Sequence, residues 1–144
     1  MDKKQSYSIQ IPTPMLRSWQ QMTDLMAESL GIPASLIMRL HPDELEVFVS
    51  SHNQGNPYQI NETHPLGHGL YCEAVIQHGA PLFISNAKKD PSWKGSPDID
   101  LGMISYYGIP LLWPNGDPFG TICILDNKEN HCLTQSKRQM IQFK

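Results

Sequence analysis

The sequence is short of several features that would reveal a function at once. It contains three cysteines, Cys72, Cys123 and Cys132, without a C-x-x-C pair, so it indicates neither a disulfide framework nor a thiol–disulfide motif. No apolar run approaches the roughly 20 residues that a membrane-spanning helix needs. The polar N-terminus also lacks the apolar segment of a signal peptide. We therefore expect a cytoplasmic protein that does not insert into a membrane.

The chain also has few charged residues and little net charge. Charged residues make up 17% of the chain and the formal net charge is −3, which argues against a nucleic-acid-binding protein and against a disordered tail. The 144 residues, 40% of them hydrophobic, are enough for one domain with a real core. We expect residues 1–12 to form a flexible lead-in and residues 13–144 to form a single domain.

Signatures of catalysis are missing as well. The chain has no phosphate-binding G-x-x-x-x-G-K-[ST], no H-E-x-x-H and no G-x-S-x-G. His64, His68 and Cys72 are spaced four apart, but the proline and glycines between them prevent one helix from presenting all three to a metal. Asp98 and Asp100 are interpreted as part of a solvated loop. The sequence thus predicts no metal, no cofactor and no enzymatic activity in this domain.

The first periodic segment predicts an amphipathic helix over residues 14–30, with Thr13 as N-cap, Pro14 at the first helical position and Gly31 at the end. Its apolar stripe is expected to pack on a sheet and consists of Met15, Trp19, Met22, Met26 and Leu30. Leu16 and Leu25 lie to one side, where a second apolar flank could serve a dimer.

The rest of the chain alternates short β-rich runs with two further helices. Turn residues between adjacent runs, above all Asn115-Gly116, favour hairpins and hence an antiparallel sheet in an α+β domain. The expected strands are 35–40, 45–51, 81–85, 106–113 and 119–126; the expected helices are 70–78 and one that starts at Thr134; and 52–66 and 86–102 are expected to be loops.

Five short stretches, taken together and in this order, resemble a GAF domain. They are GLYCEAVI at 69–76, PLFISNA at 81–87, DPSW at 90–93, YGIPL at 107–111 and FGTICILD at 119–126. The resemblance covers about residues 15–144. It is greatest to the GAF domains that precede diguanylate cyclase (GGDEF) or sensor histidine kinase modules in bacterial signalling proteins.

This resemblance implies a fold and a function. The fold would be a central antiparallel sheet of five or six strands with helices packed on it and with the N- and C-terminal helices adjacent. Those helices would pair in a homodimer and pass a signal to a C-terminal output domain, so that the final helix here is expected to be truncated. The resemblance also implies a small-ligand pocket, for which we select His68, Tyr71, Cys72, Trp93, Met103 and Tyr106.

Two ligand-binding subfamilies fit the sequence poorly. The cyclic-nucleotide motif begins with Asn127-Lys128, but its acidic pair is replaced by Lys137-Arg138. Bilin-binding relatives have a histidine after the cysteine, whereas Glu73 follows Cys72. Two alternatives to a sensor remain open. One is a ligand-free dimerisation module. The other is a thiol enzyme like free methionine-R-sulfoxide reductase, although residues 86–106 contain no cysteine.

Overall fold

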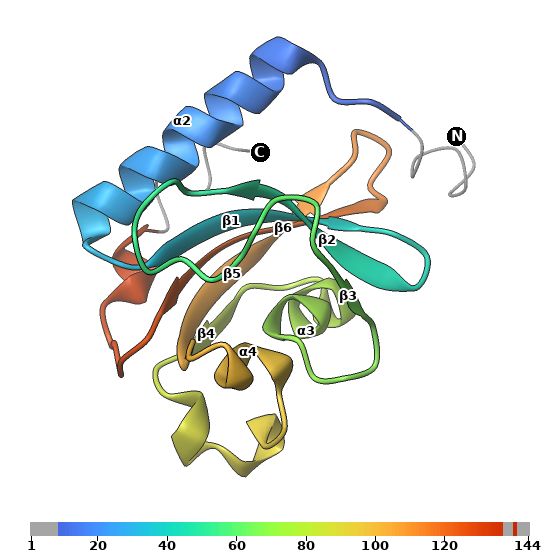
Figure 1. Ribbon diagram of the computed structural model, residues 1–144. Coiled ribbons are helices and arrows are strands. Elements are labelled where there is room, and N and C mark those ends of the chain that lie inside the picture. The colour runs from blue at the N-terminus through green and yellow to red at the C-terminus, as the bar shows by residue number, and fades with distance from the viewer. Residues whose placement is uncertain (1–8, 137–139, 141–144) are drawn as a thin grey trace.

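Six strands form one antiparallel sheet in the order β3-β2-β1-β6-β5-β4 (Figure 1). The computed structural model describes residues 9–136 and residue 140. The strands are β1 (Ala34–Leu40), β2 (Glu44–Ser50), β3 (Thr63–Pro65), β4 (Leu82–Ile84), β5 (Ser105–Leu112) and β6 (Pro118–Asp126). The predicted α+β class with a central antiparallel sheet of five or six strands is confirmed.

Helices cover both faces of this sheet. The long helix α2 (Thr13–Leu30) crosses one face, and α3 (Tyr71–His78) and α4 (Pro97–Asp100) lie on the other (Figure 1). Three short 3-10 helices complete the fold: η1 (Ala87–Lys89), η2 (Pro91–Trp93) and η3 (Leu133–Ser136). Within the described residues, no helix combines the length and apolar character needed to cross a membrane.

Most of the predicted apolar stripe of α2 packs on the sheet, but Met15 is exposed, and Leu16, which was assigned to the separate flank, packs against the core instead. Met26 is buried, and the Trp19 ring makes edge contacts with Phe48 and Phe119 at centroid distances of 6.2 and 5.7 Å. The predicted N-cap is wrong by one residue. The backbone carbonyl of Pro12 accepts the first helical hydrogen bonds, so Thr13 is already inside the helix. Gly31 ends the helix in the left-handed conformation (φ 64°), as predicted.

Both predicted hairpins are confirmed. The turn between β1 and β2 is closed by a bond of 2.9 Å from the His41 N–H to the Glu44 carbonyl. The turn between β5 and β6 is closed by a bond of 2.8 Å from the Trp113 N–H to the Asp117 carbonyl. Gly116 in that turn has φ 93°, a conformation that costs glycine little.

The two expected loops contain more structure than the sequence indicates. Residues 52–66 include β3, which pairs with β2 and completes the sheet edge. Residues 86–102 include η1, η2 and α4, which are too short for their apolar periodicity to be recognised. Of the predicted final helix, the described part is η3 and residue 140; the other residues of that segment lie outside the description.

The expected lead-in falls mostly outside the described residues. Residues 9–12 are described, and they contact the sheet through a bond of 2.6 Å from Arg39 Nη2 to the Ile9 carbonyl. The Arg39 guanidinium lies over three rings, those of Phe48, Trp113 and Phe119, at 5.3 to 5.7 Å from their centroids.

The sheet separates two hydrophobic cores. The core under α2 also contains Leu133 and Met140, so the described C-terminal residues pack on the same face as α2. The core under α3 and α4 contains residues from β1, β2, β5 and β6 together with Tyr71, Cys72 and Met103. This second core also takes in several polar side chains, which are described next.

Candidate functional site

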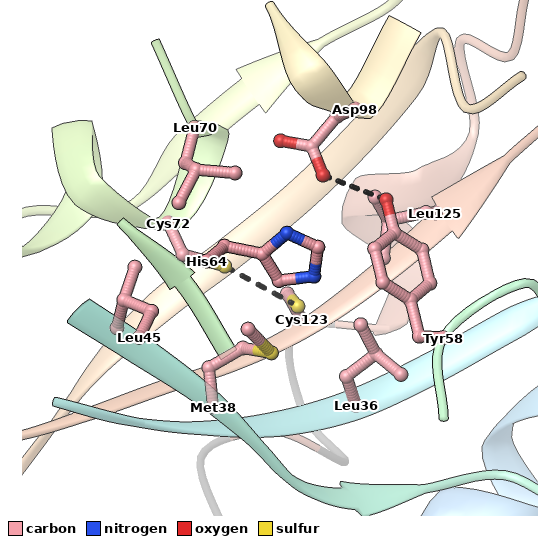
Figure 2. A pocket seen from close by; sticks show the side chains of 10 residues that line it. All are labelled: Leu36, Met38, Leu45, Tyr58, His64, Leu70, Cys72, Asp98, Cys123 and Leu125. Atoms are coloured by element: carbon pink, nitrogen blue, oxygen red, sulfur yellow. Dashed lines mark hydrogen bonds between the residues drawn. The ribbon is translucent and has the colours of Figure 1, made fainter. Parts of the chain in front are cut away.

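A small cavity lies between the sheet and the layer formed by α3 and α4 (Figure 2). Its volume is about 10 Å³, enough for about one water molecule. The side chains that line it come from β1, β2, β3, β6, α3, α4 and the segment before β3: Leu36, Met38, Leu45, Tyr58, His64, Leu70, Cys72, Asp98, Cys123 and Leu125.

Asp98 supplies a carboxylate to this core. Its residue exposure is 6%, and its two oxygens accept bonds from Tyr58 Oη at 2.7 Å and from the Tyr71 N–H at 3.0 Å. The Ser96 hydroxyl caps α4 by accepting a bond from the Asp98 N–H. Burial raises the pKa of Asp98, while the hydrogen bonds from Tyr58 and Tyr71 oppose that shift. The carboxylate thereby joins α4, α3 and the segment before β3.

Three tyrosines surround the carboxylate and the cavity. Burial raises the pKa of Tyr58, Tyr71 and Tyr106, and nearby Asp98 adds to each shift, so all three hydroxyls stay protonated as hydrogen-bond donors. Tyr71 Oη donates to the Met103 carbonyl at 2.8 Å. The Tyr71 ring packs against Trp93 and Tyr106 at centroid distances of 5.1 and 5.2 Å.

Two thiols meet at the floor of the cavity. Cys72 Sγ, from the first turn of α3, lies 3.7 Å from Cys123 Sγ, in the middle of β6 (Figure 2). Tyr106 Oη lies 3.2 Å from the Cys72 sulfur, and Thr121 Oγ1 donates to the same sulfur at 3.2 Å. Burial raises the pKa of Cys123 well above its usual value.

His64 brings an imidazole to the same cavity from β3. Its Nε2 atom is buried and makes no hydrogen bond with any described residue. The nearest charged group, Glu62 Oε1, is 3.9 Å away, which is too long for a hydrogen bond. Figure 2 shows the ring of His64 between Asp98 and the two thiols.

The six residues selected from the sequence are distributed unevenly. Cys72 lines the cavity. The other side chains of the same core, which pack around it without lining it, are Tyr71, Trp93, Met103 and Tyr106. His68 is exposed and does not line the cavity, because the turn that carries it, between Gly67 and Gly69 with φ 89° and 88°, lies on the surface. As ligand-binding residues, all six remain predictions.

Four polar residues of the cavity were not selected from the sequence: Tyr58, His64, Asp98 and Cys123. Asp98 was interpreted as solvated, which is wrong: the capped turn of α4 directs it inward, while Asp100 is exposed. The pattern Ser96-Pro97 is typical of a helix start, and it is the signal in the sequence that could have indicated α4. In the described part of the chain, no three His, Cys, Asp or Glu side chains come together in a way that could hold a metal.

An antiparallel six-stranded sheet with helices on both faces and a polar cavity under one of them defines an α+β sandwich domain. The sequence profile of the GAF domain matches residues 19–143, and the chain therefore belongs to the GAF domain family. GAF domains are generally regulatory or sensory rather than catalytic. A search of curated proteins finds no match to the sequence.

Solved structures share this fold at low sequence identity. The GAF domain of an Acinetobacter phosphoenolpyruvate-protein phosphotransferase has a TM-score of 0.68 at 14% identity, over 89% of this chain and 75% of that one. A putative GAF sensor protein from Burkholderia vietnamiensis gives 0.68 at 16%, over 88% and 75%. Free methionine-R-sulfoxide reductase from Neisseria meningitidis gives 0.69 at 13%, over 88% and 71%. These likenesses establish the fold alone.

Proposed function

We propose that this chain is a sensory domain of a bacterial signalling protein and that it binds a small polar ligand in the cavity between the sheet and α4. The observation that carries the proposal is the set of buried polar groups around that cavity. Tyr58 and the unpartnered Nε2 of His64, which are close in sequence, converge there with Asp98, which is distant in sequence. A buried polar group destabilises the fold unless it forms a hydrogen bond, and a ligand would supply a hydrogen-bond partner to His64.

The size of the cavity constrains the ligand. With about 10 Å³ available, only a molecule of about the size of water fits without movement. A larger ligand would have to displace the segment 86–104, which carries Asp98. Binding would then favour an arrangement in which that segment is raised, and a ligand shifts an equilibrium in this way when its affinities for the two arrangements differ. We propose that this change reaches the terminal helices and a C-terminal output domain, either a cyclase or a kinase.

A thermal-shift screen with small polar metabolites tests ligand binding. A cognate ligand raises stability by mass action, by about 2.7 kcal/mol at a free concentration about 100 times its Kd. We expect Asp98→Asn to reduce the shift and the matched control Asp100→Asn, at an exposed site, to retain it. Equal shifts in both variants would place the ligand elsewhere on the molecule.

A ligand-free dimerisation module is the second candidate, and the near-complete filling of the cavity supports it. No thermal shift across the panel, together with no retained molecule in native mass spectrometry, would favour this function over sensing. The thiol-enzyme alternative has its own assay, NADPH-linked reduction of free methionine sulfoxide. Turnover that Cys72→Ala abolishes would establish it, and absence of turnover would remove it.

A further inference from the structure

The two thiols at the floor of the cavity have a geometry that the sensory proposal does not use. Their sulfur atoms are 3.7 Å apart, in van der Waals contact, although the residues are 51 positions apart in sequence. Both are free thiols in buried residues, whereas the third cysteine, Cys132, is exposed. A disulfide has a sulfur–sulfur bond of about 2.05 Å, so the two sulfurs must approach each other further for the bond to form.

The surroundings of the two sulfurs differ in a way that assigns each a role. The Cys72 sulfur accepts a hydrogen bond from Thr121 and has the Tyr106 hydroxyl at 3.2 Å, so two hydroxyl groups hold it in position. Cys72 also retains 7% exposure, whereas Cys123 has none. Burial raises the pKa of Cys123, which keeps that thiol protonated. Cys72 is therefore the sulfur that reacts first, and Cys123 is the sulfur placed to resolve the product.

We propose that Cys72 and Cys123 form a redox-sensitive dithiol that hydrogen peroxide closes to a disulfide, which links α3 covalently to β6. In the first step the Cys72 thiolate attacks one peroxide oxygen, the O–O bond breaks, and the leaving hydroxide takes a proton to become water. Cys72 is then a sulfenic acid. In the second step the Cys123 sulfur displaces hydroxide from Cys72, its proton completes a second water, and the S–S bond forms.

The crosslink would act on the cavity that both sulfurs line. It would fix the first turn of α3 to the middle of β6, and so hold the helical layer against the sheet. Oxidation would then oppose any movement of that layer that admits a ligand. The chemistry itself does not depend on the sensory proposal, because the two sulfurs meet whether or not the cavity binds a ligand.

The test uses the full chain carrying Cys132→Ser, which removes the exposed thiol. The folded protein is treated with hydrogen peroxide and then unfolded, unreacted thiols are alkylated, and intact mass and peptide mapping follow. We expect a loss of two hydrogen atoms, one peptide pair joined through Cys72 and Cys123, loss of both alkylation sites, and full reversal by dithiothreitol. The thermal midpoint should rise on oxidation, because the link constrains the unfolded chain.

Two further measurements make the test selective. Thr121→Val removes a donor to the Cys72 sulfur, and we expect slower crosslinking while circular dichroism remains that of the parent. Oxidation in urea should lose its dependence on Thr121. The proposal is overturned if peroxide leaves both thiols of the folded protein unreacted, so that both are alkylated afterwards. It is also overturned if Cys72 is oxidised to a sulfinic acid while Cys123 stays a free thiol, or if the disulfide forms only in urea.

Discussion

At the scale of single residues, Asp98 has the largest structural role in the candidate site. Replacing it by alanine leaves the Tyr58 hydroxyl and the Tyr71 N–H buried without their acceptor. Each of the two unsatisfied donors costs about 1–3 kcal/mol, so we expect Asp98→Ala to lower the free energy of unfolding by about 2–6 kcal/mol. Urea unfolding followed by circular dichroism measures the change.

Asp100→Ala is the matched control for that measurement. It removes the same carboxylate two residues away, at an exposed position of α4. Exposed substitutions away from special features change stability by about 0.5 kcal/mol or less. Equal losses for the two variants would show that Asp98 does not hold α3, α4 and the segment before β3 together.

The role of Asp98 could not be predicted from the sequence, because it depends on partners that are distant along the chain. Tyr58 and Tyr71 are 40 and 27 positions away, and no local pattern brings them together. Cys72 was found because it lies in a stretch that resembles the family. Cys123 lies within the strand β6, but its contact with Cys72 follows only from the packing of α3 on β6.

At the scale of elements, the pairing of β1 with β6 depends on Gly120. A Cβ atom at this position would collide with the Met38 backbone carbonyl on the neighbouring strand. Since strand backbones cannot move apart without losing hydrogen bonds, we expect Gly120→Ala to destabilise the domain by about 3 kcal/mol. Chemical unfolding measures this loss.

Gly31→Ala provides the comparison for that variant. A Cβ atom at Gly31 would meet no atom within 4 Å, but the residue has φ 64°. Its cost is therefore conformational only, about 1 kcal/mol. A Gly120→Ala loss no larger than that of Gly31→Ala would contradict a steric role for Gly120 in the sheet.

Elements with a long apolar stripe or with clear turn residues at their ends could be predicted from the sequence, whereas very short elements could not. The stripe of α2 spans five turns of helix, and each predicted hairpin has turn residues between two apolar runs. By contrast, β3 has three residues, one of them proline, and it is a strand only because β2 offers it an edge. The helices η1, η2 and α4 have three or four residues each, less than one apolar period needs.

At the scale of the whole molecule, the sheet separates two surfaces with different roles. The cavity lies on one face, under α3 and α4, while α2 and the described C-terminal residues share the other. Strands β1 and β6 contribute side chains to both cores, and we propose that a change at the cavity reaches the terminal segments through them. Such a path suits a regulatory domain in which the input and the relay are on opposite faces.

We propose that the domain forms a homodimer through its terminal helices. Leu25 projects from α2 with 54% of its surface exposed, although neighbouring Met26 and Ala27 are buried against the sheet. If α2 pairs with its copy, Leu25→Glu places a charge in an apolar contact, and we expect it to weaken the dimer at least tenfold, about 1.4 kcal/mol. Sedimentation at tens of micromolar measures the change.

Ile60→Glu is the control, because Ile60 is similarly exposed (46%) but lies outside the helices, in the segment before β3. This variant should sediment like the parent chain. A parent chain that is already monomeric at that concentration would contradict dimerisation through α2. Dissociation by Ile60→Glu but not by Leu25→Glu would instead place the contact away from α2 and would contradict a dimer through the terminal helices.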